Sequence, residues 1–254
     1  MTILKDKKEI ENLKEGGKIL ASVLYQVAAN AQIGVATIEL DKLAEKLIKQ
    51  SGGTPSFKNY KTTEDEIPFP FILCVSINDE VVHGIPGKRA LQNGDIVGLD
   101  LGMKYKKLYT DMAITIPVGK VSDKVRKIIR VAEKSLDAGI NAAKNGARIG
   151  DIGFVVQSYV EQNGFSVVRK LVGHGLGYKP HETPEIPNFG KKGTGVILME
   201  GVVLAIEPMI TAGGSDVFLD DDMWTWKTKD GSLAAHFEHT IIITKSGAEI
   251  ITKI

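Results

Sequence analysis

The sequence predicts an α+β fold, in which helices pack against mainly antiparallel strands. Two helices followed by a series of strand-like segments occur once in each half of the 254 residues. Helices grouped in this way, rather than one helix between every two strands, are typical of α+β proteins and argue against a parallel βαβ fold. Internal symmetry is suggested by this order alone, because the two halves share no obvious residue-level repeat.

The two helices of the first half are predicted from apolar residues at helical spacing. The first covers about residues 7–34 and ends near Gly34, since glycine commonly follows the last turn of a helix. The second begins at about Thr37, a candidate N-cap residue, and ends at the glycines of residues 52–53.

The remainder of the first half is predicted to be loop and strand. Residues 54–71 contain three prolines and a polar middle, which is typical of a loop. A short strand over residues 72–78 is followed by irregular chain over residues 79–95. Residues 94–118 alternate between apolar and polar positions on both sides of a polar centre, which predicts a β-hairpin.

The second half repeats this order. One helix begins after Ser122, a candidate N-cap residue, and a second covers residues 148–164 and ends at Gly164. The strand-like segments that follow are residues 166–175, 201–210, 234–247 and 248–253. No linker rich in Pro, Gly or Ser separates the halves, so we expect a single domain over residues 1–254.

Composition and charge are those of an ordinary globular protein. Hydrophobic residues make up 43% of the chain, and the net charge of +1 gives no basis for binding nucleic acid or an anionic membrane. No apolar run approaches the roughly 20 residues that cross a bilayer, and the charged start of the chain lacks the core of a secretory signal. The single cysteine, Cys74, excludes an internal disulfide and fits a reducing compartment. We therefore expect a cytoplasmic protein.

Two acidic residues interrupt the apolar pattern of the hairpin. Asp100 and Asp111 occupy positions that a strand should bury, although aspartate is rare in strands and an unpaired buried carboxylate is costly. A turn centred on Tyr105 and Lys106 places the two carboxylates opposite each other, roughly 5 Å apart. Like charges this close are destabilising unless a cation lies between them. The alternative is that one aspartate is a solvated turn or edge residue.

Three more polar residues lie in strand-like segments: His174, Glu207 and Glu238. Each alone is explained by a buried, hydrogen-bonded histidine or a glutamate at a strand end, but the five together are not. Carboxylates with one imidazole suit divalent metals such as Mn²⁺, Fe²⁺, Co²⁺ or Zn²⁺. Four carboxylates exceed what one ion needs and suit two ions with shared ligands, roughly 3.5–4 Å apart.

Two further histidines, His236 and His239, flank Glu238. In a strand His236 lies on the same side as Glu238 and His239 on the other, so ligation by His236 is geometrically open. Residues 181–185 lack the second histidine of the zinc-binding H-E-x-x-H helix, and the chain contains no phosphate-binding P-loop. The glycines of residues 173–179 lack the setting of a dinucleotide-binding loop.

Six landmarks occur in order along the chain. They read "CVSINDEVVHGIPG", "GDIVGLDLG", "YTDMAIT", "VGHGLG…HE", "LAIEPM" and "FEHTIIIT". With these landmarks the chain resembles the type I methionine aminopeptidases, from residue 8 to residue 252. The resemblance implies the pita-bread fold, with pseudo-symmetric halves and a curved antiparallel sheet covered by helices.

The resemblance also implies how two divalent ions are held, with Co²⁺, Mn²⁺, Fe²⁺, Ni²⁺ and Zn²⁺ as candidates. Asp100 would chelate one ion. His174 and Glu207 would hold the other ion. Asp111 and Glu238 would bridge the two.

The implied reaction removes the initiator methionine from nascent proteins or peptides that have a small second residue. Water activated by the metal ions attacks the first peptide bond, because bound cations lower the pKa of water towards about 7. By resemblance, His83 contacts the region of the scissile bond, His181 bonds the substrate carbonyl and the oxyanion, and Glu207 is the general base. The substrate's α-amino group would ligate a metal. The resemblance further implies a monomer that works on nascent chains, with the ribosome as a possible neighbour.

The resemblance implies an apolar pocket for the methionine side chain. The candidate lining residues are Phe57, Tyr60, Cys74, Met209 and Trp224, with either Phe69 or Phe71. Ordinary core packing is the alternative for each of them.

Three features depart from the family pattern or add to it. Pro180 precedes His181, where these enzymes usually have a bulkier apolar residue, and the loop 61–71 is longer than expected. Both changes affect the expected shape of the pocket. The acidic run 220–222 is predicted to be a solvated loop with no metal role.

Two other functions fit the same ligands. Xaa-Pro aminopeptidases and prolidases share the set but usually carry an additional N-terminal domain, whereas the first helix here begins almost at Met1. A pita-bread protein that only binds would be expected to lose ligands, and all five are present. The helical insertion of type II methionine aminopeptidases is absent from the sequence.

Overall fold

The computed structural model describes residues 1–61 and 67–254. Its helices are α1 (Lys7–Asn30), α2 (Thr37–Gln50), α3 (Asp123–Ala142) and α4 (Ile149–Gln162). The strands of the first half are β1 (Thr54–Pro55), β2 (Leu73–Ile77), β3 (Glu80–Val82), β4 (Ile96–Tyr105) and β5 (Leu108–Pro117). Those of the second half are β6 (Ser166–Val167), β7 (Val172–Gly175), β8 (Glu182–Pro187), β9 (Val203–Ile206), β10 (Met209–Thr211), β11 (Val217–Leu219), β12 (Trp226–Thr228), β13 (Ala234–His236), β14 (Glu238–Thr244) and β15 (Gly247–Ile250).

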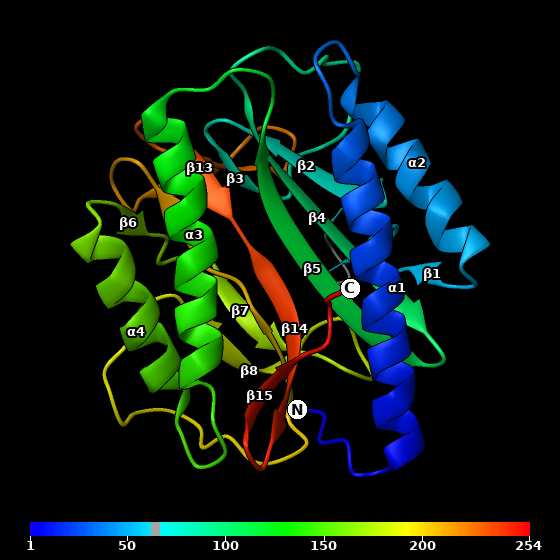
Figure 1. The fold of residues 1–254 in the computed structure, drawn as a ribbon. Coiled ribbons are helices and arrows are strands. Elements are labelled where there is room, and N and C mark those ends of the chain that lie inside the picture. Colours follow the sequence, from blue (N-terminus) through cyan, green and yellow to red (C-terminus); the bar gives the residue numbers. More distant parts are fainter. Residues whose placement is uncertain (62–66) are drawn as a thin grey trace.

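The strands form one large sheet and two small ones. The large sheet has nine strands in the order β1-β4-β5-β14-β9-β7-β8, with β2 paired to β4 and β15 paired to β14. All of its strand pairs within the described residues are antiparallel. Figure 1 shows the helices on one side of this sheet, α1 and α2 over one half and α3 and α4 over the other. The prediction of an α+β fold with an antiparallel sheet covered by helices is therefore confirmed. None of the helices in the described residues has the length and apolar character needed to cross a membrane.

The N-terminus of α2 differs from the prediction by one residue. Thr37 is the first residue of the helix, and Ala36 is the N-cap residue, without a side-chain capping bond. The hydroxyl of Thr37 instead accepts a hydrogen bond from the backbone N–H of Gly87 (2.8 Å) and donates one to its carbonyl oxygen (3.2 Å). By contrast, Ser122 caps α3 as predicted, since its Oγ accepts a bond from the N–H of Val125 (3.3 Å).

Several short strands lie in segments for which the sequence predicts no strand. They are β1, β3, β8, β11 and β12, of two to six residues each. Such segments have too few residues to show an alternating pattern, and β8 contains Pro184 and Pro187, which are unfavourable in a central strand. β8 tolerates the prolines because it lies at the edge of the large sheet.

The register of the β4–β5 hairpin corrects one prediction. Asp100 lies opposite Ala113, and Asp111 lies opposite Gly102, so the two carboxylates are not directly opposite each other. The turn falls on residues 106–107, whose φ angles of 44° and 77° match the twist that two-residue hairpin turns favour. Because the turn lies one residue later than predicted, each residue pairs with a partner two positions further along. A shift of two keeps both aspartates on one face of the hairpin, where they are diagonal neighbours.

That face is turned away from the helices. Leu99, Leu101 and Met112 belong to the main hydrophobic core, together with buried residues of all four helices. Because successive side chains of a strand point to opposite faces, Asp100 and Asp111 point to the side of the sheet that no helix covers.

A buried carboxylate on α2 anchors the start of β2. Asp41 is buried, and its Oδ1 accepts hydrogen bonds from the N–H groups of Ile72 (2.8 Å) and Leu73 (3.0 Å). Burial raises the pKa of Asp41, and the two backbone bonds oppose that rise. We expect Asp41→Ala to lower the free energy of unfolding by roughly 2 kcal/mol, because it leaves two buried donors unpaired.

Asp41→Asn is the matched control, since its amide oxygen can accept both bonds. Urea unfolding should place it much closer to the wild type than the alanine variant. Equal stability of the alanine variant and the wild type would contradict a role for Asp41 as an anchor.

Candidate metal centre and its cavity

The five residues predicted as metal ligands come together on neighbouring strands. Asp100 lies on β4, Asp111 on β5, Glu238 at the start of β14, His174 on β7, and Glu207 directly after β9. The strands carrying them are adjacent in the sheet, in the order β4-β5-β14-β9-β7. The order of strands, not closeness in sequence, therefore assembles the cluster.

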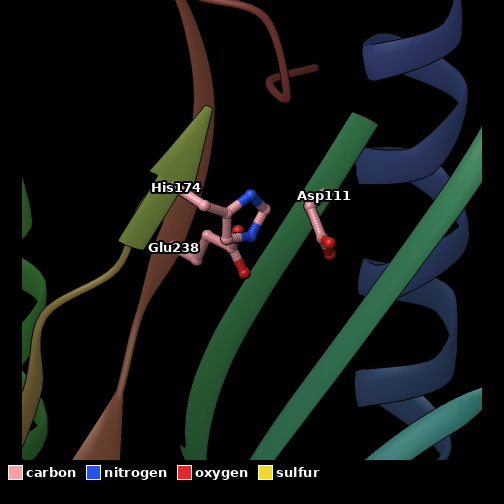
Figure 2. A group of neighbouring side chains, drawn as sticks. All are labelled: Asp111, His174 and Glu238. Carbon is pink, nitrogen blue, oxygen red and sulfur yellow. The ribbon is translucent and has the colours of Figure 1, made fainter. Parts of the chain in front are cut away.

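The distances within the cluster suit a metal ion. One side-chain ligand atom each from Asp111, His174 and Glu238 lies within 4.8 Å of the others. Figure 2 shows these three side chains beside one another on β5, β7 and β14. The Nε2 atom of His174 is 3.5 Å from Oε1 of Glu207, which adds a fourth residue to the group.

The backbone prepares His174 to be a ligand through Nε2. Its Nδ1 atom lies 2.9 Å from the carbonyl oxygen of Gly175. A carbonyl can only accept, so Nδ1 carries the proton and Nε2 keeps its lone pair. Metal-binding histidines commonly have this second hydrogen bond. Burial lowers the pKa of His174 to about 4, which leaves the ring neutral at pH 7.

Four carboxylates share this buried space without basic partners other than histidine in the described part of the chain. Asp100 is 9% exposed, Asp111 4% and Glu238 2%. Burial raises the pKa of Asp100 to about 7 and the pKa values of Asp111 and Glu238 well above the usual range. The nearby acids raise the values for Asp111 and Glu238 further, and burial alone raises that of Glu207.

Two atoms of the cluster have no hydrogen-bond partner among the described residues. They are Oδ1 of Asp100 and Oε1 of Glu238. Buried polar atoms without partners are rare because each costs free energy. Oxygen-rich groups with an imidazole are ligands for divalent cations, so unpaired oxygens and raised pKa values both fit a cation site.

The acid cluster predicts a pH dependence for the metal-free protein. A carboxyl whose pKa is raised in the folded state keeps a proton that the unfolded chain has released, so stability falls as the pH rises. The five histidines have lowered pKa values and contribute the opposite slope, but only below their ordinary pKa of about 6.5. Above pH 7 the acids remain, with a slope of about 1.4 kcal/mol per pH unit for each proton that is retained. The raised pKa of Cys74 adds a slope of the same sign towards pH 8.5.

We therefore expect the chelator-treated protein to lose stability between pH 7 and pH 8.5 in denaturant titrations. Adding Mn²⁺ should remove the decline, because a cation binds the ionised carboxylates and binds more tightly as they lose protons. A flat or rising stability of the metal-free protein across this range would count against a clustered set of protonated acids.

A cavity of about 490 Å³ lies over the cluster. Six residues predicted for the methionine pocket line it: Phe57, Tyr60, Phe69, Cys74, Met209 and Trp224. Phe71 is not among the residues that line the cavity, whereas Phe69 is. The rings of Phe57 and Phe69 lie edge to face at 6.4 Å, and those of Phe69 and Trp224 at 5.2 Å. Residues 62–66 of the long loop lie outside the described part of the chain.

Cys74 forms part of the apolar lining of the cavity and is not a reactive thiol. It is 3% exposed, and burial followed by the charge of Asp100 raises its pKa well above the usual value. A thiol without thiolate character is a weak nucleophile.

Two histidines stand beside the cluster in the same cavity. The ring of His181 lies 4.2 Å from that of His174 and 4.8 Å from that of Tyr60. His83 has a left-handed φ of 59°, and its ring is 6.3 Å from that of Trp224. Burial lowers the pKa of His83 to about 4. Although His181 is an exposed residue, desolvation of its ring by the surrounding protein, and then the charge of His174, lower its pKa to about 3. Both rings are therefore neutral hydrogen-bonding groups at pH 7.

His236 lies closer to the cluster than the sequence could establish. It is 3% exposed, and its Nε2 atom is 3.5 Å from Oε2 of Glu207 and has no hydrogen-bond partner in the described residues. His239 is bonded elsewhere, with Nδ1 2.9 Å from Oγ1 of Thr252. Strand parity correctly separates the two histidines, but the approach of His236 to Glu207 depends on the pairing of β10 with β13.

The acidic run 220–222 has a structural role that its composition does not indicate. Asp222 is exposed as predicted, yet its Oδ1 accepts bonds from the N–H groups of Trp224 (2.8 Å) and Thr225 (2.7 Å). This turn holds Trp224 at the cavity.

The lining residues that were not predicted as part of the site are Val82, Lys170, Leu171, Val172, Glu182, Thr183 and Glu185. Pro180 is not among the lining residues, although His181 is.

Comparison with known proteins is consistent with this geometry. The sequence pattern of Metallopeptidase family M24 matches residues 11–245. The chain is 46% identical over 254 residues to the methionine aminopeptidase of Clostridium perfringens and 44% identical to methionine aminopeptidase 1 of Bacillus subtilis, in both cases covering 100% of each chain. The crystal structure of the Thermotoga maritima methionine aminopeptidase superposes with a TM-score of 0.95 at 42% identity, again over 100% of both chains.

Proposed function

The chain belongs to metallopeptidase family M24, and we propose that it releases the N-terminal methionine from peptides and nascent proteins whose second residue is small. Its fold is the pita-bread fold, and it is a metal-dependent aminopeptidase, as its full-length relatives are. The observation that carries the proposal is that the acid cluster and a set of apolar side chains line the same cavity. A cluster of four carboxylates and a histidine lies at the wall of a cavity that is also lined by aromatic, thiol and thioether side chains.

The five clustered residues fit divalent cations, and we propose that they hold two. Asp111 and Glu238 would be the shared ligands, Asp100 would complete one position, and His174 with Glu207 would complete the other. Manganese, iron, cobalt, nickel and zinc ions are all compatible with this set of oxygen and nitrogen donors. When bound, such cations lower the pKa of a water molecule and polarise the substrate carbonyl.

The protein's own residues bind and orient the substrate. The apolar pocket of Phe57, Phe69, Cys74, Met209 and Trp224 accepts an unbranched thioether side chain and excludes water from it. The free α-amino group of the substrate, as a neutral amine, would ligate a cation held by the acids beside the pocket, which selects the first residue of a chain over an internal one.

Three groups handle protons and developing charge. Glu207 accepts the proton of the attacking water as general base. His181 is neutral, so its ring N–H donates a hydrogen bond to the oxygen of the scissile carbonyl as negative charge develops there. His83 also lines the cavity, beside Trp224, and we assign it to the amide nitrogen side of the same bond.

We further propose a single catalytic domain over residues 1–254 that acts as a cytoplasmic monomer on chains emerging from the ribosome. Its partners are then peptides, with no stable contact to nucleic acid or membrane. Gel filtration with light scattering tests the monomer.

The test of the function is metal-dependent release of methionine. The protein is treated with chelator, supplied with Mn²⁺, Fe²⁺ or Co²⁺, and offered Met-Ala-Ser beside Met-Leu-Ser, Leu-Ala-Ser and Ala-Pro-Ser. We expect turnover of Met-Ala-Ser alone, and only after metal is restored. Activity that persists in chelator, or cleavage of the Xaa-Pro peptide in preference to Met-Ala-Ser, would refute the proposal.

A further inference from the structure

The seam between β5 and β14 is where the shared ligands Asp111 and Glu238 meet. Only two residue pairs of this seam face each other directly, Glu238–Ala113 and His239–Met112. A regular antiparallel ladder would continue with Thr240 opposite Asp111. The ladder stops there instead, although β14 remains paired with β9 on its other side.

A threonine hydroxyl takes the place of the missing ladder bonds. The Oγ1 atom of Thr240 accepts a hydrogen bond from the N–H of Asp111 at 2.8 Å and donates one to the carbonyl oxygen of Asp111, also at 2.8 Å. Thr240 is fully buried, with 0% exposure. One side chain therefore satisfies both backbone groups of a ligand residue on the neighbouring strand.

The same device occurs on the other side of the paired residues. Oγ1 of Thr115, on β5, accepts a bond from the N–H of His236 at 2.9 Å and donates one to its carbonyl oxygen at 2.6 Å. β5 and β13–β14 are thus joined by a short ladder in the middle and by a threonine hydroxyl at each end. A hydroxyl between two backbones separates them more than a direct N–H···O=C bond does, so the strands diverge from the paired centre.

We propose that Thr240 is a positioning residue that sets the placement of the Asp111 carboxylate relative to that of Glu238. Thr240 follows Glu238 by two positions on β14, so both side chains lie on one face of that strand. The hydroxyl of Thr240 is hydrogen-bonded to the backbone of Asp111. Thr240 therefore links the two residues whose carboxylates are proposed to share a cation. Because that shared cation belongs to the proposed function, the inference rests on it.

A purely structural role is the alternative, because a buried hydroxyl that pairs two backbone groups also stabilises the fold. The two roles differ in what its removal changes. A structural hydroxyl contributes to the free energy of unfolding and leaves cation affinity unaltered. A positioning hydroxyl contributes to the affinity as well, and loss of outer partners of metal ligands typically costs 10- to 100-fold.

The test measures Mn²⁺ affinity of the full-length, chelator-treated protein by titration, with free Mn²⁺ followed by its paramagnetic resonance signal. Thr240→Val removes the hydroxyl with little change of shape, and Thr240→Ser keeps the hydroxyl. We expect Mn²⁺ affinity to fall by about 10-fold or more in the valine variant and to stay within about 2-fold of the wild type in the serine variant. Thr240→Ala compared with Thr240→Ser isolates the hydroxyl a second time, if the valine variant does not fold.

Thr228→Val is the matched control. Thr228 is 1% exposed on β12, and its Oγ1 donates a 2.7 Å bond to the carbonyl oxygen of Ser232. The control should lose stability in urea and keep its Mn²⁺ affinity. Wild-type affinity in Thr240→Val, or an equal loss in Thr228→Val, overturns the positioning role while leaving the proposed function intact. A wild type that binds no Mn²⁺ overturns both.

Discussion

Replacing Glu238 by glutamine is expected to lower kcat/KM for methionine release by at least about 100-fold without unfolding the protein. Glutamine has nearly the same shape, so the packing of this 2% exposed side chain is kept. The substitution removes one of the negative charges proposed to hold a cation. Loss of a residue that only hydrogen-bonds to a metal ligand already lowers metal affinity or activity 10- to 100-fold. Asp111→Asn is expected to behave in the same way.

The stability of these variants separates loss of function from loss of fold. In the metal-free protein burial, and then the charges of Asp111, Glu207 and Asp100, raise the pKa of Glu238. Glutamine is neutral, like the protonated glutamate, and needs no retained proton, so Glu238→Gln in chelator should be at least as stable as the wild type. Glu249→Gln, which removes a half-buried acid on β15 that pairs with Lys14, is the control and should leave kcat/KM unchanged. Wild-type turnover in Glu238→Gln would remove this residue from the shared position.

Replacing His181 by alanine is expected to reduce kcat by about 100- to 1,000-fold with a smaller change in KM. His181 is assigned to the oxygen of the scissile carbonyl, where negative charge exists only in the transition state, and removal of one such donor costs this much in other hydrolases. An interaction made only in the transition state affects kcat rather than ground-state binding. Steady-state kinetics on Met-Ala-Ser in saturating Mn²⁺ supplies both constants.

His181→Gln tests the reason for that loss. Since the pKa of His181 is lowered to about 3, the ring acts as a neutral donor, and the amide of glutamine can replace it in part. We expect the glutamine variant to recover a measurable fraction of kcat. A rise in KM with unchanged kcat in the alanine variant would show that His181 binds substrate only in the ground state.

The general fold and the clustered acids could be predicted from the sequence because both leave local signals. Helices show their spacing of apolar residues, and an acid within an apolar run is conspicuous wherever it occurs, as at Asp100 and Glu207. The register of the hairpin leaves no such signal. Tyr105, Lys106 and Lys107 are all suited to a turn, and only the twist of the paired strands selects residues 106–107.

Other parts of the site depend on contacts between distant segments. His236 faces Glu207 because β13 pairs with β10, and nothing in the sequence near either residue indicates this pairing. Thr240 reads as an ordinary β-branched residue in a strand, which is where threonine is common. Its link to Asp111 spans 129 positions and becomes visible only when the two strands lie side by side.

The order of strands has a consequence for synthesis of the protein itself. The first proposed ligand, Asp100, and the last, Glu238, are 138 positions apart (238 − 100) and lie on strands that are separated in the sheet by β5 alone. Until translation reaches Glu238, a growing chain lacks at least one of the five proposed ligands. If Glu238 holds a cation as proposed, we expect the nascent chain to be inactive until this residue has been added and folded into the sheet. Activity then requires both the folded sheet and bound cations, because strands from distant parts of the chain supply the proposed ligands.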